Sequence, residues 1–230
     1  MYNILVILNI YKEKNWTSFD VVAKLRGVLK TKRIGHAGTL DPLAEGVLII
    51  LTDADTKKQD FFMKQVKEYE AEIAFGITTP TWDLEITPDF VGNIPSEKQV
   101  DELIPNFIGE IEQTIPMYSA KRVDGKHLYE LARKGLEPTK PVAKKKVVVH
   151  NIEKLGFVSQ TIVTTQGEKQ VNILQCRVTC SSGTYVRSLA FDMANKLGTG
   201  GMLVKLLRTK VGEFTIADAK KLTALAQPEL

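Results

Sequence analysis

The sequence is poor in the residues that hold metal ions. Only two cysteines and three histidines occur among its 230 residues. Cys176 and Cys180 share one face of an alternating apolar segment, so we expect both to be buried as small apolar side chains. Their spacing is not that of a zinc site, and the histidines, His36, His127 and His150, are scattered along the chain. We therefore expect no metal ion.

Long apolar runs and a strong excess of one charge are missing too. No stretch approaches the roughly 20 apolar residues of a membrane-spanning helix, and the first residues lack the basic start and small-residue cleavage site of a secretory signal. A cytoplasmic protein is therefore expected. The net charge of +4 permits a polyanionic partner without requiring one, although a cluster of lysines surrounds residue 144.

The predicted strands and helices do not alternate regularly along the chain. This favours an α+β fold with a mixed sheet and an inserted subdomain over a doubly wound parallel fold. Residues 47–51 are continuously apolar, as in a buried strand, and Thr17 and Asp20 form a capping-box pattern at the start of a helix. Strands are also expected at 66–75, 146–157 and 171–180, helices at 97–107, 127–135 and 184–197, and a long surface connection at 78–96.

The most informative segment of the chain spans residues 35–46 and has the sequence GHAGTLDPLAEG. Three of its residues are glycine, which supplies positive φ angles, and Pro42 fixes φ and removes a backbone donor. Asp41 is therefore presented on a constrained loop just before the apolar run. A carboxylate held in this way can act as a nucleophile, a base or a metal ligand, or it can simply cap a turn.

This segment, continued by Val47 and Leu48, closely resembles the signature of the TruB-type tRNA pseudouridine synthases, in which the aspartate is catalytic. Other segments resemble further blocks of that family, in the family's order: 16–22, 67–71, 115–126, 128–135, 183–190 and 206–214. One departure lies at residues 12–15, which read KEKN where the family usually has Lys-Pro-x-Gly. The resemblance covers most of the chain.

The resemblance implies the pseudouridine synthase fold, in which a mixed, mainly antiparallel sheet is flanked by helices. It implies a single catalytic domain over residues 1–230, with an RNA-binding insertion that grips the substrate at about 115–150. Because only residues 215–230 follow the last shared block, we expect no C-terminal RNA-binding domain, which family members usually carry. The implied reaction converts uridine 55 in the T loop of tRNA to pseudouridine after base flipping. No cofactor is expected, because the uracil is both leaving group and incoming nucleophile.

Three catalytic residues follow from the resemblance. Asp41 is the nucleophile; attack on C6 of uracil, attack on C1′ of ribose and assistance in elimination to a glycal all stay open. Tyr69 stacks on the flipped base and takes part in removing the C5 proton. Arg187 pairs with Asp41, keeping it ionised and oriented. On the sequence pattern alone, Tyr69 also fits a core tyrosine and Arg187 an exposed helix residue.

The resemblance further implies five residues that contact the RNA. His36 wedges into the RNA loop, and Leu206 forms an apolar wall of the uracil pocket. Lys121, Arg122 and Lys126 contact the phosphates and the folded shape of the RNA. The residue types alone also fit an exposed histidine, a core leucine and a solvated charged surface. The expected partner is the T-arm stem-loop of tRNA, with no membrane association, and the protein is expected to be a monomer.

Two other functions stay open. A tRNA-binding RNA chaperone would refold tRNA without chemistry as its main contribution, but binding alone has no need of an aspartate, a tyrosine and an arginine together. The catalytic subunit of a guide-RNA pseudouridylation particle carries a closely similar signature, but such subunits depend on the C-terminal RNA-binding domain. The tRNA pseudouridine synthase is therefore the leading hypothesis.

Overall fold

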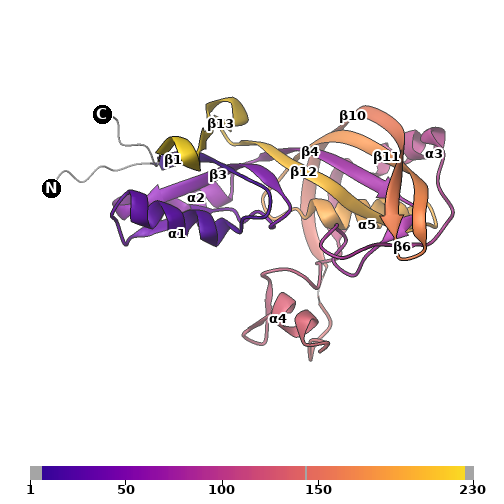
Figure 1. The fold of residues 1–230 in the computed structure, drawn as a ribbon, viewed down its shortest axis with the longest axis horizontal. Helices are drawn as coiled ribbons and strands as arrows, with labels where there is room; N and C mark the ends of the chain where they lie inside the picture. Colours follow the sequence, from indigo (N-terminus) through magenta and orange to yellow (C-terminus); the bar gives the residue numbers. More distant parts are fainter. Residues whose placement is uncertain (1–6, 143, 226–230) are drawn as a thin grey trace. The chain divides into compact units, whose positions relative to one another are not determined.

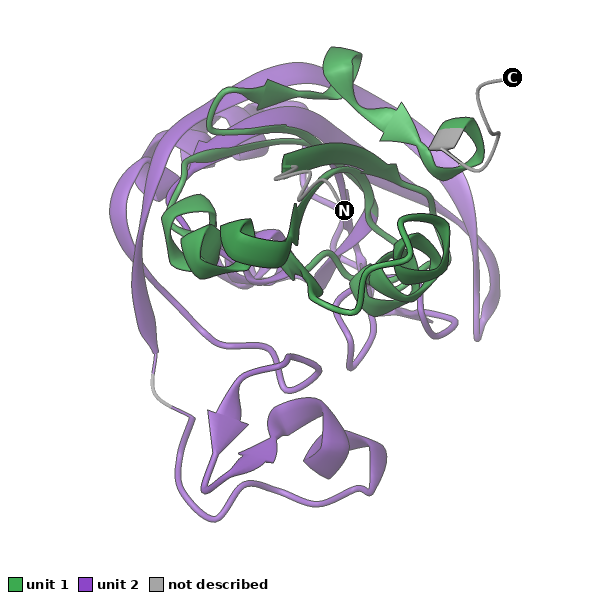
Figure 2. Ribbon diagram, turned by 90° about the vertical axis from the view of Figure 1, so that its left-hand side faces the viewer, with its two compact units in different colours: residues 1–70, 205–230 green, residues 71–204 purple. Residues whose placement is uncertain are grey.

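The computed structural model describes residues 7–142 and 144–225 (Figure 1). The described chain divides into two compact units, which Figure 2 shows in different colours. The first unit holds residues 7–70 and 205–225, and the second holds residues 71–142 and 144–204. Two strands contribute residues to both units, β4 (Lys67–Phe75) and β12 (Gly201–Val211). The single domain over residues 1–230 and the limits of its insertion stay predictions.

The sheet of the first unit is built around β3 (Glu45–Thr52), which contains the strand predicted at 47–51. It pairs antiparallel with β1 (Ile7–Lys12) on one side and with β2 (Ile34–Ala37) on the other, while its first residues pair in parallel with β12. β14 (Lys220–Lys221) runs parallel beside β1, and β13 (Phe214–Thr215) pairs antiparallel with β12. The sheet is therefore mixed, as predicted.

Alternate residues of β3 enter two apolar cores. The even-numbered positions, such as Leu48, pack against α1 (Ser18–Val28), and the odd-numbered positions pack with α2 (Gln59–Met63), as Ile49 does in the cluster that contains Phe62. Successive side chains of a strand point to opposite faces, so the sheet has one core on each face. The prediction of a strand buried on both faces is confirmed.

The predicted start of α1 is also confirmed. The hydroxyl of Thr17 accepts from the N–H of Asp20 over 3.0 Å, and the carboxylate of Asp20 accepts from the N–H of Thr17 over 2.8 Å. This reciprocal pair satisfies two backbone donors that a helix N-terminus leaves unpaired. The remaining short helices of the first unit are η1 (Asp53–Lys58), η3 (Ile216–Asp218) and α6 (Leu222–Leu225).

The second unit contains a long antiparallel hairpin of β10 (Lys145–Thr164) and β11 (Gly167–Cys180). β11 lies between β4 and β10, and β7 (Gly109–Gln113) pairs antiparallel with the start of β10. The strands predicted at 146–157 and 171–180 are therefore correct in place but shorter than the observed ones. Two small antiparallel pairs complete the strands: β5 (Ile77–Thr78) with β6 (Asp89–Phe90), and β8 (Arg122–Val123) with β9 (Lys126–His127).

The helices of the second unit lie where the sequence predicted them. They are α3 (Glu97–Leu103) with the following η2 (Ile104–Phe107), α4 (Leu128–Arg133) and α5 (Val186–Lys196). Gly198, with φ 67°, follows the end of α5, as expected for a residue that stops a helix. The ring of Phe191, on α5, stacks on Trp82 with centroids 4.1 Å apart.

Both cysteines are buried on β11, as predicted. Burial raises the pKa of the Cys176 thiol to about 12, so it behaves as a small apolar side chain. Within residues 7–142 and 144–225, no three His, Cys, Asp or Glu side chains are grouped to hold a metal ion. Over the same residues, no helix has the length and apolar character needed to span a membrane.

Candidate active site

Asp41 lies in the loop between β2 and β3 of the first unit, and hydrogen bonds fix this loop to the chain around α1. Ser18, at the start of α1, donates to the carbonyl of Leu40 over 3.2 Å and accepts from its N–H over 2.9 Å. The N–H of Asn15 donates to the carbonyl of Pro42 over 2.8 Å. The residues on both sides of Asp41 are therefore held in place.

Lys12, the last residue of β1, is a buried cation beside the same loop. Its ammonium donates to the carbonyls of Glu13, Trp16 and Pro42, at 3.0, 2.6 and 3.2 Å. Burial lowers the pKa of Lys12 to about 8, and the negative charge of Asp41 acts against this shift. Positive charge therefore stands near Asp41 within the first unit itself. In the sequence, Lys12 stood out only as the first residue of the segment at 12–15 that departs from the family pattern, and no role was predicted for it.

The departure at residues 12–15 keeps the lysine of the family pattern and replaces its proline and glycine. Asn15 stands where the glycine is usual and has φ 67°. Asparagine is one of the few residues that adopt a left-handed conformation readily. The turn is therefore formed without glycine, and the N–H of Asn15 still reaches the carbonyl of Pro42.

The other predicted site residues of the first unit lie on its strands. Tyr69 is on β4 and is buried, and Leu206 is on β12 and is half-buried. His36 pairs with Ile50 in the ladder of β2 and β3. Burial, and then the positive charge of Arg208, lowers the pKa of His36, and the buried Nδ1 atom has no hydrogen-bond partner among the described residues.

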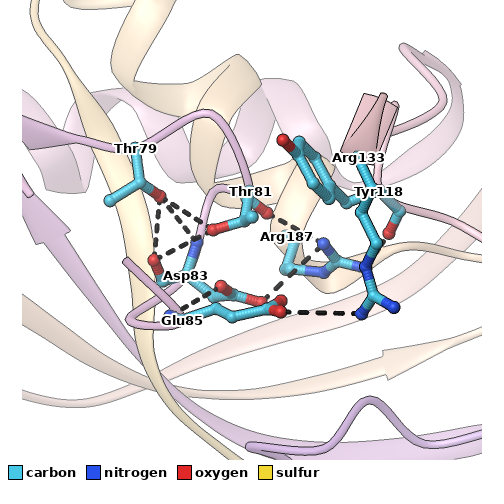
Figure 3. A network of polar contacts seen from close by, with 7 residues as sticks. All are labelled: Thr79, Thr81, Asp83, Glu85, Tyr118, Arg133 and Arg187. Carbon is cyan, nitrogen blue, oxygen red and sulfur yellow. Dashed lines mark hydrogen bonds and ion pairs between the residues drawn. The ribbon is translucent and has the colours of Figure 1, made fainter. Parts of the chain in front are cut away.

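Arg187 lies in the first turn of α5 and is buried in the second unit (Figure 3). Its Nη1 atom donates to the carbonyl of Thr81 over 2.8 Å, and its Nη2 atom donates to the carbonyl of Tyr118 over 2.9 Å. The carboxylate of Asp83 lies 3.7 Å from Nη1. Two segments and one acid therefore fix the position of this guanidinium.

The prediction of a plain surface connection at 78–96 is wrong in its first part. Thr79, Thr81 and Asp83 are buried. The hydroxyls of both threonines donate to the backbone carbonyl of Asp83, at 2.8 and 3.3 Å, and Figure 3 shows these bonds beside Arg187. Polar residues can be buried when they satisfy one another. Asp83 is thus a candidate site residue that sequence analysis missed; its only local signal is an acid inside a run of threonines.

A family model described as the N-terminal domain of the TruB family pseudouridylate synthases matches residues 26–186. The chain belongs to the TruB family. The matched residues contain the Asp41 loop, Tyr69 and the segment with Asp83, and they end one residue before Arg187. The resemblance read from the sequence is confirmed.

Curated relatives of this TruB-family chain carry the name tRNA pseudouridine synthase B. The protein of Lactococcus lactis subsp. lactis is 42% identical over 224 residues, which cover 95% of this chain and 65% of the relative. That of Clostridium kluyveri is 43% identical over 214 residues, covering 93% and 69%. That of Parabacteroides distasonis is 42% identical over 220 residues, covering 91% and 87%. The chain thus spans about two-thirds of the length of some relatives and most of the length of another.

Solved structures with the same fold include protein chains from two larger complexes. A chain of a Cbf5–Nop10–Gar1 complex superposes with a TM-score of 0.68 and 26% identity, covering 94% of this chain and 52% of that one. A chain of an H/ACA ribonucleoprotein bound to a substrate RNA containing 2′-deoxyuridine gives 0.64 and 24% identity, covering 94% and 51%. The predicted pseudouridine synthase fold is confirmed.

Asp41 and Arg187, the predicted ion pair of this TruB-family chain, belong to different compact units. Each residue has a neighbour of opposite charge in its own unit. Lys12 lies near Asp41, and Asp83 lies near Arg187. Their pairing, like the roles of Tyr69 and the RNA-contacting residues, stays a prediction.

The segment predicted to be an RNA-gripping insertion carries the predicted basic residues on its surface. Lys121, Arg122 and Lys126 are exposed. Nε of Arg122 donates to Nε2 of His127 over 3.2 Å, so the other ring nitrogen of a neutral His127 donates to the carbonyl of Ala120, 2.8 Å away. This histidine therefore joins Arg122 to the chain that precedes β8.

The same segment adds aromatic side chains to its cations. The rings of His127 and Tyr129 stack with centroids 5.2 Å apart, and the guanidinium of Arg133 lies 5.6 Å from the centroid of Tyr129. At the start of β10, burial and then the positive charge of Lys121 lower the pKa of Lys145. Cations and aromatic rings together are the groups that bind RNA phosphates and bases.

Proposed function

We propose that this chain is a tRNA pseudouridine synthase that converts uridine 55 in the T loop of tRNA to pseudouridine. The observation that carries the proposal is the Asp41 loop: it has the family's sequence in a chain about 42% identical to proteins named tRNA pseudouridine synthase B. The loop is also bound to its surroundings at Leu40 and Pro42, so the backbone that carries Asp41 has a defined position.

The reaction breaks the bond between N1 of uracil and C1′ of ribose and forms a bond between C5 and C1′. The proton on C5 leaves, and N1 gains one, so the reaction is an isomerisation that consumes no second reactant. Asp41 is the nucleophile or the group that assists departure of the base, by attack on C6, attack on C1′ or formation of a glycal. Tyr69 stacks on the flipped uracil, and Leu206 forms an apolar wall beside it.

Arg187 is proposed to steady the charge of Asp41. Its own neighbours support a fixed position, because two carbonyls accept its hydrogen bonds and Asp83 offsets part of its charge at 3.7 Å. A guanidinium that is already oriented loses little freedom when a carboxylate comes to it. Lys12 adds positive charge near Asp41, within the unit that carries both residues.

RNA binding is proposed to use the exposed insertion and β2. Lys121, Arg122 and Lys126 contact phosphates, and His36 fills the space that the flipped base leaves in the RNA loop. A tRNA stem-loop carries a dense negative charge, which these cations complement. As a tRNA-modifying enzyme the protein works in the cytoplasm, as a monomer on one T arm.

The direct test is to incubate the protein with an unmodified tRNA transcript and map pseudouridine at nucleotide resolution. The expected result is one new pseudouridine, at position 55, without added metal or cofactor. A transcript with cytidine at that position is the matched control and should gain none. No pseudouridine in tRNA, together with turnover only when a guide RNA is added, would support the guide-RNA particle instead.

An RNA chaperone is distinguished by the role of Asp41. If refolding of tRNA were the main contribution, a protein with Asp41→Asn would restore growth of cells that lack their own synthase as well as the wild type does. If catalysis is the contribution, the substituted protein fails to restore pseudouridine in the T loop of those cells.

A further inference from the structure

Arg208, on β12, is one of the largest fully buried side chains of the described chain, with 1% of its surface exposed. Its Nε atom donates to the carbonyl of Val47 over 2.7 Å, and its Nη2 atom donates to the carbonyl of Gly38 over 2.9 Å. Gly38 precedes Asp41 by three residues and Val47 follows it by six. One guanidinium therefore ties together the two ends of the loop that carries Asp41.

The backbone of Arg208 also lies against the end of the same loop. Arg208 pairs with Gly46 where β12 and β3 run in parallel. Gly46 has φ 104°, and a Cβ at this position would overlap the carbonyl oxygen of Arg208. Glycine is thus required at Gly46 both by its conformation and by the approach of β12. Side chain and backbone of one residue contact the loop on both sides of Asp41.

Arg208 is an unusual choice if its role is only to fill space. A buried charge carries a large desolvation cost, and an apolar side chain of similar size often stabilises a protein as well or better. A guanidinium differs in being planar and always charged, with donors in a fixed fork. Those properties suit a residue that must hold two carbonyls in a set geometry.

We propose that Arg208 is a positioning residue for Asp41: by holding the carbonyls of Gly38 and Val47 it sets where the carboxylate stands when the uridine binds. The proposal rests on the proposed function, since it assigns Arg208 a part in that reaction. It is also a statement about the loop, which can be measured without catalysis. Displacing a reacting group by about 1 Å can cost on the order of 100-fold in rate.

The first variant is Arg208→Lys. It keeps a buried positive charge but replaces the planar guanidinium, with donors on separate nitrogens, by an ammonium group with a single nitrogen. We expect kcat for pseudouridine formation to fall about 10- to 100-fold. KM and the Kd for tRNA should stay within about twofold, because Arg208 is 1% exposed and offers no surface of its own for RNA to contact. A kcat equal to that of the wild type would overturn the proposal.

The matched control is Asn9→Ala on β1. Asn9 is also a side chain of the first unit that holds a backbone carbonyl over 2.7 Å, but this carbonyl belongs to Thr215, outside the Asp41 loop. We expect a lower Tm with kcat unchanged when the assay is run well below both melting temperatures. If Asn9→Ala lowered kcat as much as Arg208→Lys, the effect of Arg208 would be a general one on folding and the proposal would fail.

A second variant keeps the test valid if Arg208→Lys does not fold. Gly38→Ala disturbs the same hydrogen bond at its acceptor residue. Gly38 has φ 86°, which a side chain disfavours, and the added Cβ would lie 3.5 Å from Nη1 of Arg208. It should lower kcat in the same way. In the double variant the two losses should not multiply, because both act through one contact. Multiplying losses would contradict the proposal.

Amide hydrogen exchange separates this proposal from the function it rests on. Arg208→Lys should raise exchange at residues 39–46 at least about 10-fold over exchange elsewhere in the first unit, whether or not RNA is present. If the wild type forms no pseudouridine, the proposed function fails while exchange still reports whether Arg208 holds the loop. Unchanged exchange with an active wild type overturns the Arg208 proposal alone.

Discussion

The carboxylate of Asp83 lies 3.7 Å from Nη1 of Arg187, and the two side chains are 11% and 5% exposed. Asp83 is fixed by its own segment: its backbone carbonyl accepts from Thr79 and Thr81, and one carboxylate oxygen accepts from the N–H of Glu85 over 3.0 Å. At 3.7 Å the contact with Arg187 is electrostatic rather than a hydrogen bond. Asp83 therefore acts mainly as a buried counter-charge for Arg187.

Asp83→Ala should destabilise the protein strongly. It removes the counter-charge and leaves the guanidinium of Arg187 buried, which typically costs about 3–5 kcal/mol. The free energy of unfolding, measured in urea, checks this. Glu85→Ala is the control in the same network, because its contact with Arg133 is 3.9 Å long and both side chains are largely exposed. That change should cost less than about 1 kcal/mol. Equal losses for the two substitutions would contradict the buried counter-charge.

Asp41→Asn should abolish pseudouridine formation while leaving the Kd for tRNA within about twofold, because a carboxamide has nearly the shape of a carboxylate but is a poor nucleophile. Single-turnover assays and a binding titration on one T-arm hairpin give the two numbers. Asp60→Asn, in the exposed first turn of α2, is the control and should keep full activity. Turnover by Asp41→Asn at a rate near that of the wild type would exclude Asp41 as the catalytic group.

Two glycines of the first unit should respond to alanine in opposite directions. Gly46→Ala forces a side chain into a residue with φ 104° and against the carbonyl of Arg208, so we expect a loss of more than about 3 kcal/mol. Gly27→Ala adds a methyl group in α1, where nothing lies within 4 Å, and should stabilise by about 0.5–1 kcal/mol. Urea unfolding of both proteins is the measurement. A Gly46→Ala protein as stable as the wild type would show that the loop does not need this approach of β12.

The exposed lysines of the insertion should determine the salt dependence of tRNA binding. Lys121→Ala and Lys126→Ala should each weaken binding and lower the slope of log K against log salt by about 1, the amount expected for one lost phosphate contact. Lys98→Ala, on α3, is the control, because Lys98 faces solvent and is paired with Glu102 at 3.9 Å. Slopes unchanged by the insertion variants would place the RNA elsewhere.

Asp192→Asn should stabilise the protein near neutral pH but not in acid. Burial raises the pKa of Asp192 from 3.8 to about 6, against the effects of the Thr114 N–H and of Lys144. The folded protein therefore binds the proton of Asp192 more tightly than the unfolded chain does. The contribution of the protonated Asp192 to the free energy of unfolding is fully present below pH 3.8 and is lost as the pH rises through about 6. The amide has no such charge and can still accept from Thr114. Its gain in Tm over the wild type should be greatest at pH 7 and disappear near pH 4; a gain independent of pH would contradict the raised pKa.

Features that depend on neighbouring residues were predictable from the sequence. The capping box of Thr17 and Asp20, the buried run at 47–51 and the end of α5 near Gly198 were predicted correctly, because each depends on residues within a few positions. The hairpin of β10 and β11 was predicted too short. The missed residues, 158–164 and 167–170, lie next to the turn of the hairpin and are mostly exposed, without a clean apolar alternation; the pairing of the two strands forms this part.

Partners of buried charges were not predictable in the same way. The segment at 78–96 was taken for a surface connection because its prolines and polar residues are typical of one, whereas Asp83 is buried against Arg187. Lys12 was noted only as the first residue of the segment at 12–15 that departs from the family pattern, and Arg208 only as part of a shared block. Nothing in the sequence near these residues indicates which carbonyls they bind.

The sequence by itself determined the family, the mixed fold and the loop that presents Asp41, because a long ungapped match and local backbone preferences are written in consecutive residues. Only the tertiary structure decided how the charges are held. Arg187 reaches a carbonyl 106 residues away, and Arg208 reaches Gly38 across 170 residues. A buried cation needs hydrogen-bond acceptors, and the fold brings these from distant parts of the chain. No periodic pattern in the sequence indicates which carbonyls they are.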